Sequence, residues 1–96
     1  MSKVTLSGHI EVPSEDIEAV LAELPNHITL TRQEAGCIVF TVAQDTENPH
    51  RFDVYEAFTD KSAFEQHQAR VTASHWGEVT KNVERFYKIT GNEHLT

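Results

Sequence analysis

The chain has a single cysteine among its 96 residues, together with one tryptophan, three prolines and four glycines. One cysteine cannot form a disulfide within the chain, and this usage is typical of a protein from a reducing compartment. No apolar run is long enough to cross a bilayer, and the start, Met1-Ser2-Lys3, leads directly into an alternating segment rather than a secretory signal. We therefore expect a soluble, cytoplasmic protein that does not enter a membrane.

Basic residues are also scarce, because 8 lysines and arginines stand against 15 aspartates and glutamates, which gives a formal net charge of −7. Nucleic-acid binding needs a positive surface that meets the phosphate backbone, so nucleic acid is not an expected partner. The length indicates one domain over residues 1–96, with a core at about 4–90 and a short C-terminal tail. A domain this small buries only about 60–65% of its unfolded surface, so self-association would add to its stability.

Hydrophobic periodicity predicts the element order β-α-(α)-β-β-α-β. Apolar residues at every second position, or β-branched and aromatic runs, indicate strands at residues 4–12, 37–43, 51–58 and 85–89. Ser14 is a good cap for a first helix, and Asp60 or Ser62 for a later one. Because Pro25 cannot donate a backbone hydrogen bond, we expect a kink or break there, with a second helical piece from about Asn26 to Gln33. Gly36 is expected to be a left-handed cap after it.

This order is that of a split β-α-β, ferredoxin-like α+β fold, in which an antiparallel sheet carries helices on one face. The opposite face would be uncovered, yet strand parity places apolar residues there, namely Val39, Ala43 and Tyr55. An uncovered apolar sheet favours packing against a second copy. We therefore expect a homodimer, closed into an α/β barrel by sheet-on-sheet packing.

Two polar residues stand among apolar ones. Glu56 shares one face of its predicted strand with Phe52, Val54 and Phe58. His67 follows Phe64 by three residues and precedes Val71 by four, so it should point inward from its helix. We expect the two side chains to face one gap between the layers, where His67 would act as a base and Glu56 would orient it or hold a substrate hydroxyl. The pocket walls would come from Phe40, Val54, Phe64 and Trp76.

Structural roles are also open for these residues. His67 can be a core histidine with a backbone or carboxylate partner, and Glu56 can be one half of an ion pair with Arg51, Arg85 or Lys88. Phe64 and Trp76 can be core residues. His27, His50 and His94 are expected at the surface. The six histidines include no pair with i, i+4 or His-x-His spacing on one predicted element, so no metal site is expected.

Three segments resemble the antibiotic biosynthesis monooxygenase (ABM) family of dimeric α+β barrels. They are Glu-x-Gly-Cys-aliphatic-x-aromatic at residues 34–40, Arg-Phe-x-x-Tyr-Glu-x-aromatic at 51–58, and Asp-x-x-Ala-aromatic-x-x-His at 60–67. The resemblance covers nearly the whole chain, from about Val4 to Ile89. One departure is the segment from Ala69 to Ser74, which is longer here than in the family and would reshape the rim of the pocket.

The resemblance implies an oxygenase that uses no metal, flavin or haem, has molecular oxygen as its co-substrate, and oxidises a small phenolic or quinol-like aromatic. Relatives on this fold also include isomerases and haem-degrading enzymes. Alternatives are therefore an isomerase or other proton-transfer enzyme that uses the same residues, or a dimer that binds a small ligand without catalysis. Haem binding is less consistent with the sequence, since the first strand lacks the asparagine of the haem enzymes.

Overall fold

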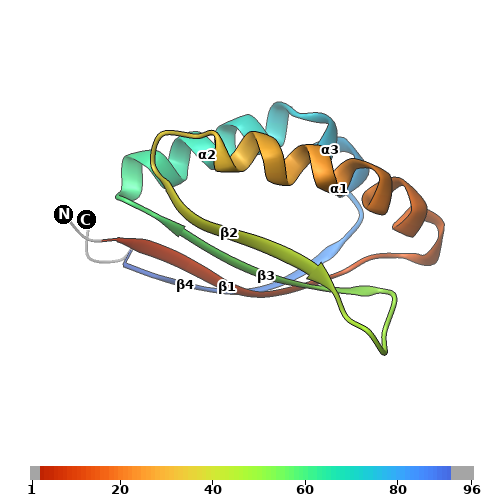
Figure 1. Cartoon of the computed structure of the whole chain (residues 1–96). Coiled ribbons are helices and arrows are strands. Elements are labelled where there is room, and N and C mark those ends of the chain that lie inside the picture. The colour runs from red at the N-terminus through yellow and green to blue at the C-terminus, as the bar shows by residue number, and fades with distance from the viewer. Residues whose placement is uncertain (1–2, 92–96) are drawn as a thin grey trace.

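In the computed structural model, which describes residues 3–91, four antiparallel strands form one sheet with helices on a single face (Figure 1). The strands lie in the order β2-β3-β1-β4. This is the predicted ferredoxin-like α+β arrangement. The elements are β1 (Val4–Glu11), the 3-10 turn η1 (Ser14–Asp16), α1 (Ile17–Arg32), β2 (Cys37–Gln44), β3 (Arg51–Phe58), α2 (Lys61–Ala73), α3 (His75–Val79) and β4 (Glu84–Thr90). Of the expected C-terminal tail, residues 92–96 lie outside the described residues.

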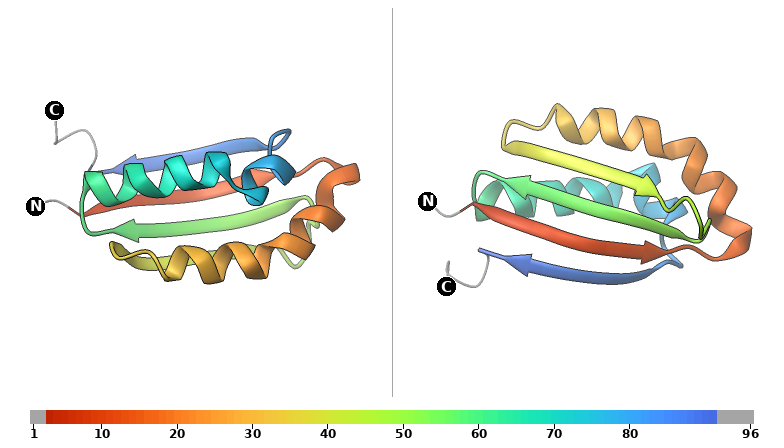
Figure 2. Two further views of the ribbon diagram at one scale, coloured as in Figure 1. Left: turned by 90° about the horizontal axis from the view of Figure 1, so that it is seen from above. Right: turned by 60° about the horizontal axis from the view of Figure 1, so that its bottom comes forward.

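The helix layer consists of α1 and α2 on the same face of the sheet, with α3 in contact with both (Figure 2). The expectation of a break at Pro25 followed by a separate helix was wrong, because α1 runs through Pro25 without interruption. A proline inside a helix leaves the carbonyl four residues earlier without its partner, and here that residue is the exposed Leu21. The lost bond therefore falls on the solvent side of the helix, where it is tolerated.

The core lies between the helices and the sheet, and its most deeply buried large side chains come from the strands, namely Val4, Leu6, Phe52 and Phe58. Alternate residues of a strand point to the same face of the sheet, and this alternation places these residues on the inner face as expected. Ile38 is an exception, because the register of β2 against β3 shifts between Cys37 and Val39 and leaves Ile38 exposed. The left-handed cap expected at Gly36 was also wrong. Gly36 is needed for space, since a Cβ there would lie 2.3 Å from the Cβ of Ala63.

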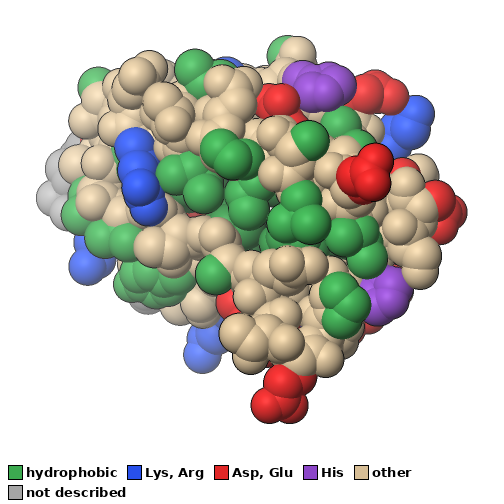
Figure 3. Space-filling view, turned by 45° about the vertical axis from the view of Figure 1, so that its right-hand side comes forward, with side chains coloured by type: hydrophobic (Ala, Val, Ile, Leu, Met, Phe, Trp, Pro, Cys, Tyr) green, Lys and Arg blue, Asp and Glu red, His purple; other side chains and the backbone are tan. Residues whose placement is uncertain are grey.

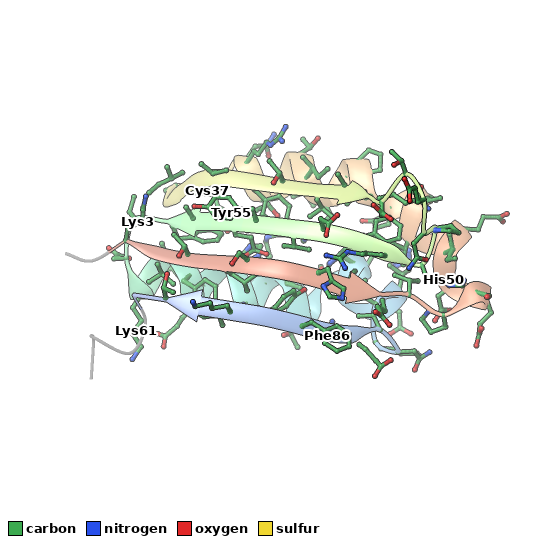
Figure 4. All side chains as sticks on the ribbon, turned by 90° about the horizontal axis from the view of Figure 1, so that it is seen from below. Lys3, Cys37, His50, Tyr55, Lys61 and Phe86 are labelled. Carbon is green, nitrogen blue, oxygen red and sulfur yellow. The ribbon has the colours of Figure 1, made fainter. Side chains whose placement is uncertain are left out.

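Among residues 3–91, no element covers the opposite face of the sheet (Figure 4). Tyr55 on β3 and Phe86 on β4 project from it, and both are more than two fifths exposed. On the face shown in Figure 3, lysine and arginine side chains are scattered and form no continuous basic patch. Within residues 3–91, no helix combines the length and the apolar character that crossing a membrane requires.

Candidate functional site

Glu56 lies on the inner face of β3, where the sheet register places it between Leu6 of β1 and Phe40 of β2. Its side chain is buried, with 7% of the residue exposed. The position follows from strand parity, since the residues two before and two after it, Val54 and Phe58, are core residues. A carboxyl group among apolar neighbours is costly unless it has a partner or becomes neutral.

His67 lies directly above Glu56, on the inward face of α2. Asp60 caps this helix, accepting a 2.8 Å hydrogen bond from the backbone N–H of Ala63, and thereby fixes the phase that turns His67 inward. His67 is 2% exposed, and its Nε2 is 3.7 Å from Glu56 Oε1. The structure thus brings together the two residues that the sequence singled out. The basic side chain within ion-pair distance of Glu56 is this histidine rather than a lysine or arginine.

A third residue, Glu34, completes the arrangement from the loop between α1 and β2. Both of its carboxylate oxygens are 3.2 Å from His67 Nδ1. Arg70, one turn after His67, donates a 2.5 Å hydrogen bond to Glu34 Oε2 and a 2.9 Å hydrogen bond to Thr31 Oγ1 of α1. Sequence reasoning missed Glu34 and Arg70 as site residues. The available signals were the i, i+3 spacing of His67 and Arg70 and the position of Glu34 at the start of the Glu-x-Gly-Cys run.

The Glu34 carboxylate determines which nitrogen of His67 carries the proton in the neutral ring. A carboxylate only accepts hydrogen bonds, so Nδ1 must be the N–H donor to Glu34. Nε2 is then left with a lone pair, and it faces Glu56 in the interior. A histidine held in one tautomer by a carboxylate is the arrangement that general-base catalysis requires.

Burial shifts both inner groups toward their neutral forms. Burial and, secondarily, the nearby Glu34 charge raise the pKa of Glu56 to about 7. Burial lowers the pKa of His67, and the hydrogen bond and charge of Glu34 oppose this effect. Near neutral pH the pair therefore consists of an uncharged imidazole and a carboxyl group that gains and loses its proton, which is a composition suited to moving a proton.

Aromatic rings surround the pair. The ring centres of Phe58 and Phe40 are 4.9 and 5.7 Å from that of His67. Of the other predicted wall residues, Phe64 packs against Phe58, with ring centres 5.9 Å apart, and Val54 lies opposite Val42 in the sheet. Both are buried core residues, and no ring contact joins Phe64 to His67 within the described residues.

His27 is the largest departure from the sequence-based expectation, which placed it at the surface. It is 3% exposed, and its ring stacks on Trp76 of α3, with ring centres 4.4 Å apart and planes at 3°. Its ring also meets Phe40 edge-on at 5.2 Å and lies 6.1 Å from the ring of His67. Trp76 therefore joins the cluster through His27.

The family profile described as "antibiotic biosynthesis monooxygenase" matches residues 4–79. The chain belongs to the ABM family. The match includes Glu34, Glu56, His67 and Trp76, so the cluster described above lies within the part of the chain that is typical of this family.

Solved structures of similar proteins agree with this fold. A Pseudomonas aeruginosa protein is 27% identical, with a TM-score of 0.74 over 93% of this chain and 90% of that one. A Shewanella oneidensis protein is 26% identical, with a TM-score of 0.71 over 92% and 86%. A protein named antibiotic biosynthesis monooxygenase is 22% identical, with a TM-score of 0.73 over 94% of both chains, and at this identity it supports the fold alone. No curated protein sequence matches the chain significantly.

The residues Glu34, Glu56, His67, His27 and Trp76, with the rings that touch them, are called the ABM cluster. A hollow of about 300 Å³ opens on its outer side, beside Glu34. It is lined by Glu34, Ala35, Gly36, Ala63, Gln66 and Arg70. Because Glu34 lines the hollow and also contacts His67 Nδ1, its carboxylate lies between the surface and the buried pair. Within residues 3–91, no group of three or more histidine, cysteine, aspartate or glutamate side chains is arranged to hold a metal ion.

Proposed function

We propose that this ABM protein is a cofactor-independent oxygenase that converts a small phenolic or quinol-like aromatic into a quinone. The observation that supports this most directly is the line Glu34–His67–Glu56, in which one carboxylate fixes the histidine tautomer and the free nitrogen faces a second, buried carboxyl group. His67 and Glu56 are the proposed catalytic residues. Molecular oxygen is the co-substrate, and no metal, flavin or haem takes part.

The proposed reaction begins with removal of the phenolic proton by His67 Nε2. The resulting phenolate is electron-rich. It can therefore give electrons one at a time to molecular oxygen, and ground-state oxygen accepts electrons only in this way. For a phenol with a free para carbon, the balance is one phenol and one O2 to one quinone and one water. One oxygen atom forms the new carbonyl at that carbon, and the other leaves as water with the two hydrogens that the substrate loses. All four electrons that reduce O2 come from the substrate.

Glu56 would hold the substrate oxygen on the far side of the base. Its Oε1 is buried and has no hydrogen-bond partner, and the 3.7 Å separation from His67 Nε2 exceeds a hydrogen bond. A substrate hydroxyl bound between the two atoms would satisfy both. The closed aromatic surroundings would keep bulk water from the anion.

Access to the pair would run between α1 and α2. The Arg70 side chain bridges this seam through its bonds to Thr31 and Glu34, beside the 300 Å³ hollow. Arg70 is partly exposed, so these bonds can exchange with water. A ligand in the hollow that separated Arg70 from Thr31 would reach the interior between the two helices.

The decisive experiment is oxygen uptake by metal-free protein with hydroquinones, anthrones and naphthols. We expect uptake above the spontaneous rate, and we expect His67→Ala to lower it by about 100-fold or more, since a positioned base contributes factors of this size. His75→Ala, which alters an exposed histidine of α3, is the matched control and should retain activity. Protein-dependent uptake that survives in His67→Ala would contradict the assignment of the base.

Proton transfer without oxygen is the second candidate, and the pKa of Glu56 favours it specifically. A carboxyl group with a pKa of about 7 beside a neutral imidazole can take a proton from one carbon and return it to another near neutral pH. An isomerase of this kind would exchange substrate C–H hydrogens for deuterium in D2O and would consume no oxygen. A non-catalytic dimer that binds a small ligand would do neither.

The oligomeric state belongs to the same proposal. The uncovered sheet face carries Val39, Tyr55 and Phe86, and Phe86 stacks on His9 with ring centres 4.8 Å apart. Burying this face against a second copy would close the predicted α/β barrel and would leave both helix layers outside. The cluster around His67 lies on the other side of the sheet, so such a homodimer would leave the hollow beside Glu34 and Arg70 uncovered.

A further inference from the structure

A second unpartnered polar atom lies in the ABM cluster, and the reaction proposed above does not use it. Within residues 3–91, three buried side-chain polar atoms have no hydrogen-bond partner, and two of them are Glu56 Oε1 and His27 Nδ1. Phe40 contacts the ring of His27 and the ring of His67, so both atoms belong to the same aromatic surroundings. Buried polar atoms without partners cost free energy, and each one calls for an explanation.

The position of His27 is well determined by its neighbours. Its ring lies flat on Trp76 and edge-on to Phe40, which limits the directions in which its nitrogens can point. Burial, together with the nearby His67 and Arg70, lowers the pKa of His27 to about 3. The ring is therefore neutral at physiological pH, and its Nδ1 can form one hydrogen bond with an uncharged oxygen of a ligand.

His27 of α1 and His67 of α2 also lie close together, with their ring planes tilted by 37°. Their ring centres are 6.1 Å apart, so a ligand that opened the seam would be within reach of both rings. The Arg70–Thr31 bond crosses the same seam one helical turn further along α1. A ligand that enters beside Arg70 would therefore meet His67 on one side and His27 on the other.

We propose that His27 is the specificity-determining residue of this site and that its Nδ1 binds the second oxygen of a dioxygenated aromatic ring, while His67 and Glu56 hold the first. The inference rests on the proposed function for the location of the ligand, but it concerns binding and does not require turnover. A ring with one oxygen would leave His27 Nδ1 unsatisfied and would bind more weakly. Discrimination against a ligand that lacks a hydrogen-bonding group is strong when the protein group is buried.

The test compares two ligands of the same skeleton, 1-naphthol and 1,3-dihydroxynaphthalene, under anaerobic conditions. Trp76 is the chain's single tryptophan and stacks on His27, so its fluorescence reports binding. We expect the wild type to bind the diol at least about tenfold more tightly than the naphthol. His27→Phe keeps a flat ring against Trp76 but removes the nitrogen, so it should bind the two ligands equally. His27→Asn, which returns a polar group near the Nδ1 position, should recover part of the preference.

A structural role for His27 predicts different results. His27→Phe would then change stability while keeping the preference for the diol, and that outcome would overturn the proposal. Because the variant removes a buried atom without a partner, we expect the ligand-free His27→Phe protein to unfold at equal or higher denaturant concentration than the wild type. His50→Phe alters a histidine outside the cluster and should leave the preference unchanged.

Oxygen uptake separates the two proposals. Loss of the diol preference in His27→Phe, without uptake by the wild type, would retain the binding role and refute the oxygenase. Uptake by the wild type, with the diol preference intact in His27→Phe, would retain the oxygenase and refute the role of His27. A wild type that binds neither ligand would refute the proposed site and the role of His27 together.

Discussion

At the scale of single residues, the clearest consequence of the site is how Glu56 affects stability at different pH. Its pKa of about 7 in the folded chain lies above the ordinary value of 4.5, so the folded state holds the proton more tightly than the unfolded state. The stabilisation is fully present below the unfolded pKa and is lost as the pH rises through the folded pKa. Glu56→Gln should therefore match the wild type at about pH 4 and be more stable by about 1–3 kcal/mol at about pH 8.

Denaturant unfolding at the two pH values measures this difference. Glu65→Gln is the matched control, because Glu65 is an exposed acid on α2 and its replacement should change neither value appreciably. A Glu56→Gln variant that is less stable than the wild type at the higher pH would mean that the ionised carboxylate stabilises the fold through a structural bond with His67.

Glu34 is expected to act through His67. Burial lowers the pKa of His67, and the hydrogen bond and charge of Glu34 act against that lowering; the same charge adds to the effect of burial in raising the pKa of Glu56. Glu34→Gln should therefore lower both pKa values and should weaken the preference for the Nδ1–H tautomer. Nuclear magnetic resonance of the His67 ring nitrogens would follow both effects. We expect kcat to fall by about tenfold or more with a smaller change in KM, because the base is misoriented while the substrate still binds.

An unchanged tautomer and titration of His67 in Glu34→Gln would mean that packing alone orients the ring. Glu23→Gln provides the comparison, because Glu23 is an acid of α1 whose carboxylate accepts a hydrogen bond from Asn26, away from the site.

At the scale of the elements, α1 tolerates a proline that weakens it. Pro25 is exposed, and its missing N–H removes one backbone bond from the middle of the helix. Pro25→Ala should restore this bond and raise the free energy of unfolding by about 1–3 kcal/mol. Denaturant unfolding measures the gain, and Ala22→Gly, at an exposed position of the same helix, should lower the same quantity by about 1 kcal/mol.

A loss of stability in Pro25→Ala would instead mean that the proline sets a bend on which the packing of α1 depends. His27 lies two residues further along and stacks on α3, so it is the contact through which such a bend would act. The position of its ring in the variant would then differ from that in the wild type.

At the scale of the whole molecule, we expect the exposed sheet face to govern assembly. A stable interface buries about 800 Å² per partner, and the uncovered face of four strands is the apolar surface available for it. We expect a dimer in sedimentation experiments and unfolding that depends on protein concentration. Tyr55→Lys should give a monomer of lower stability, whereas Thr29→Lys, on the exposed side of α1, should remain dimeric.

A wild type that sediments as a monomer at every concentration would contradict the sheet-on-sheet arrangement. The location in the cytoplasm and the domain limits at residues 1–96 stay predictions of the sequence.

Much of the fold and the direction of the two central side chains could be predicted from the sequence. Period two places Glu56 on the inner face of β3, and helical spacing from the Asp60 cap turns His67 toward it. These are properties of short segments, because strand and helix geometry relate each residue to its near neighbours in the chain. Local spacing also misled in one place, since the shifted register at Cys37 and Val39 leaves Ile38 exposed.

The partners of those side chains were decided only by the tertiary structure. Glu34 meets His67 across 33 positions of the chain, and Arg70 meets Thr31 across 39. His27 follows Val20 by seven residues and Leu24 by three, so it lies on the buried face of the continuous helix α1. The break expected at Pro25 hid this spacing, and only the stacking of α3 against α1 shows that Trp76 covers the ring. Such contacts depend on how helices pack on the sheet, and no local periodicity records that packing. The sequence therefore determined which residues face the interior, and the packing of the layers determined which of them meet.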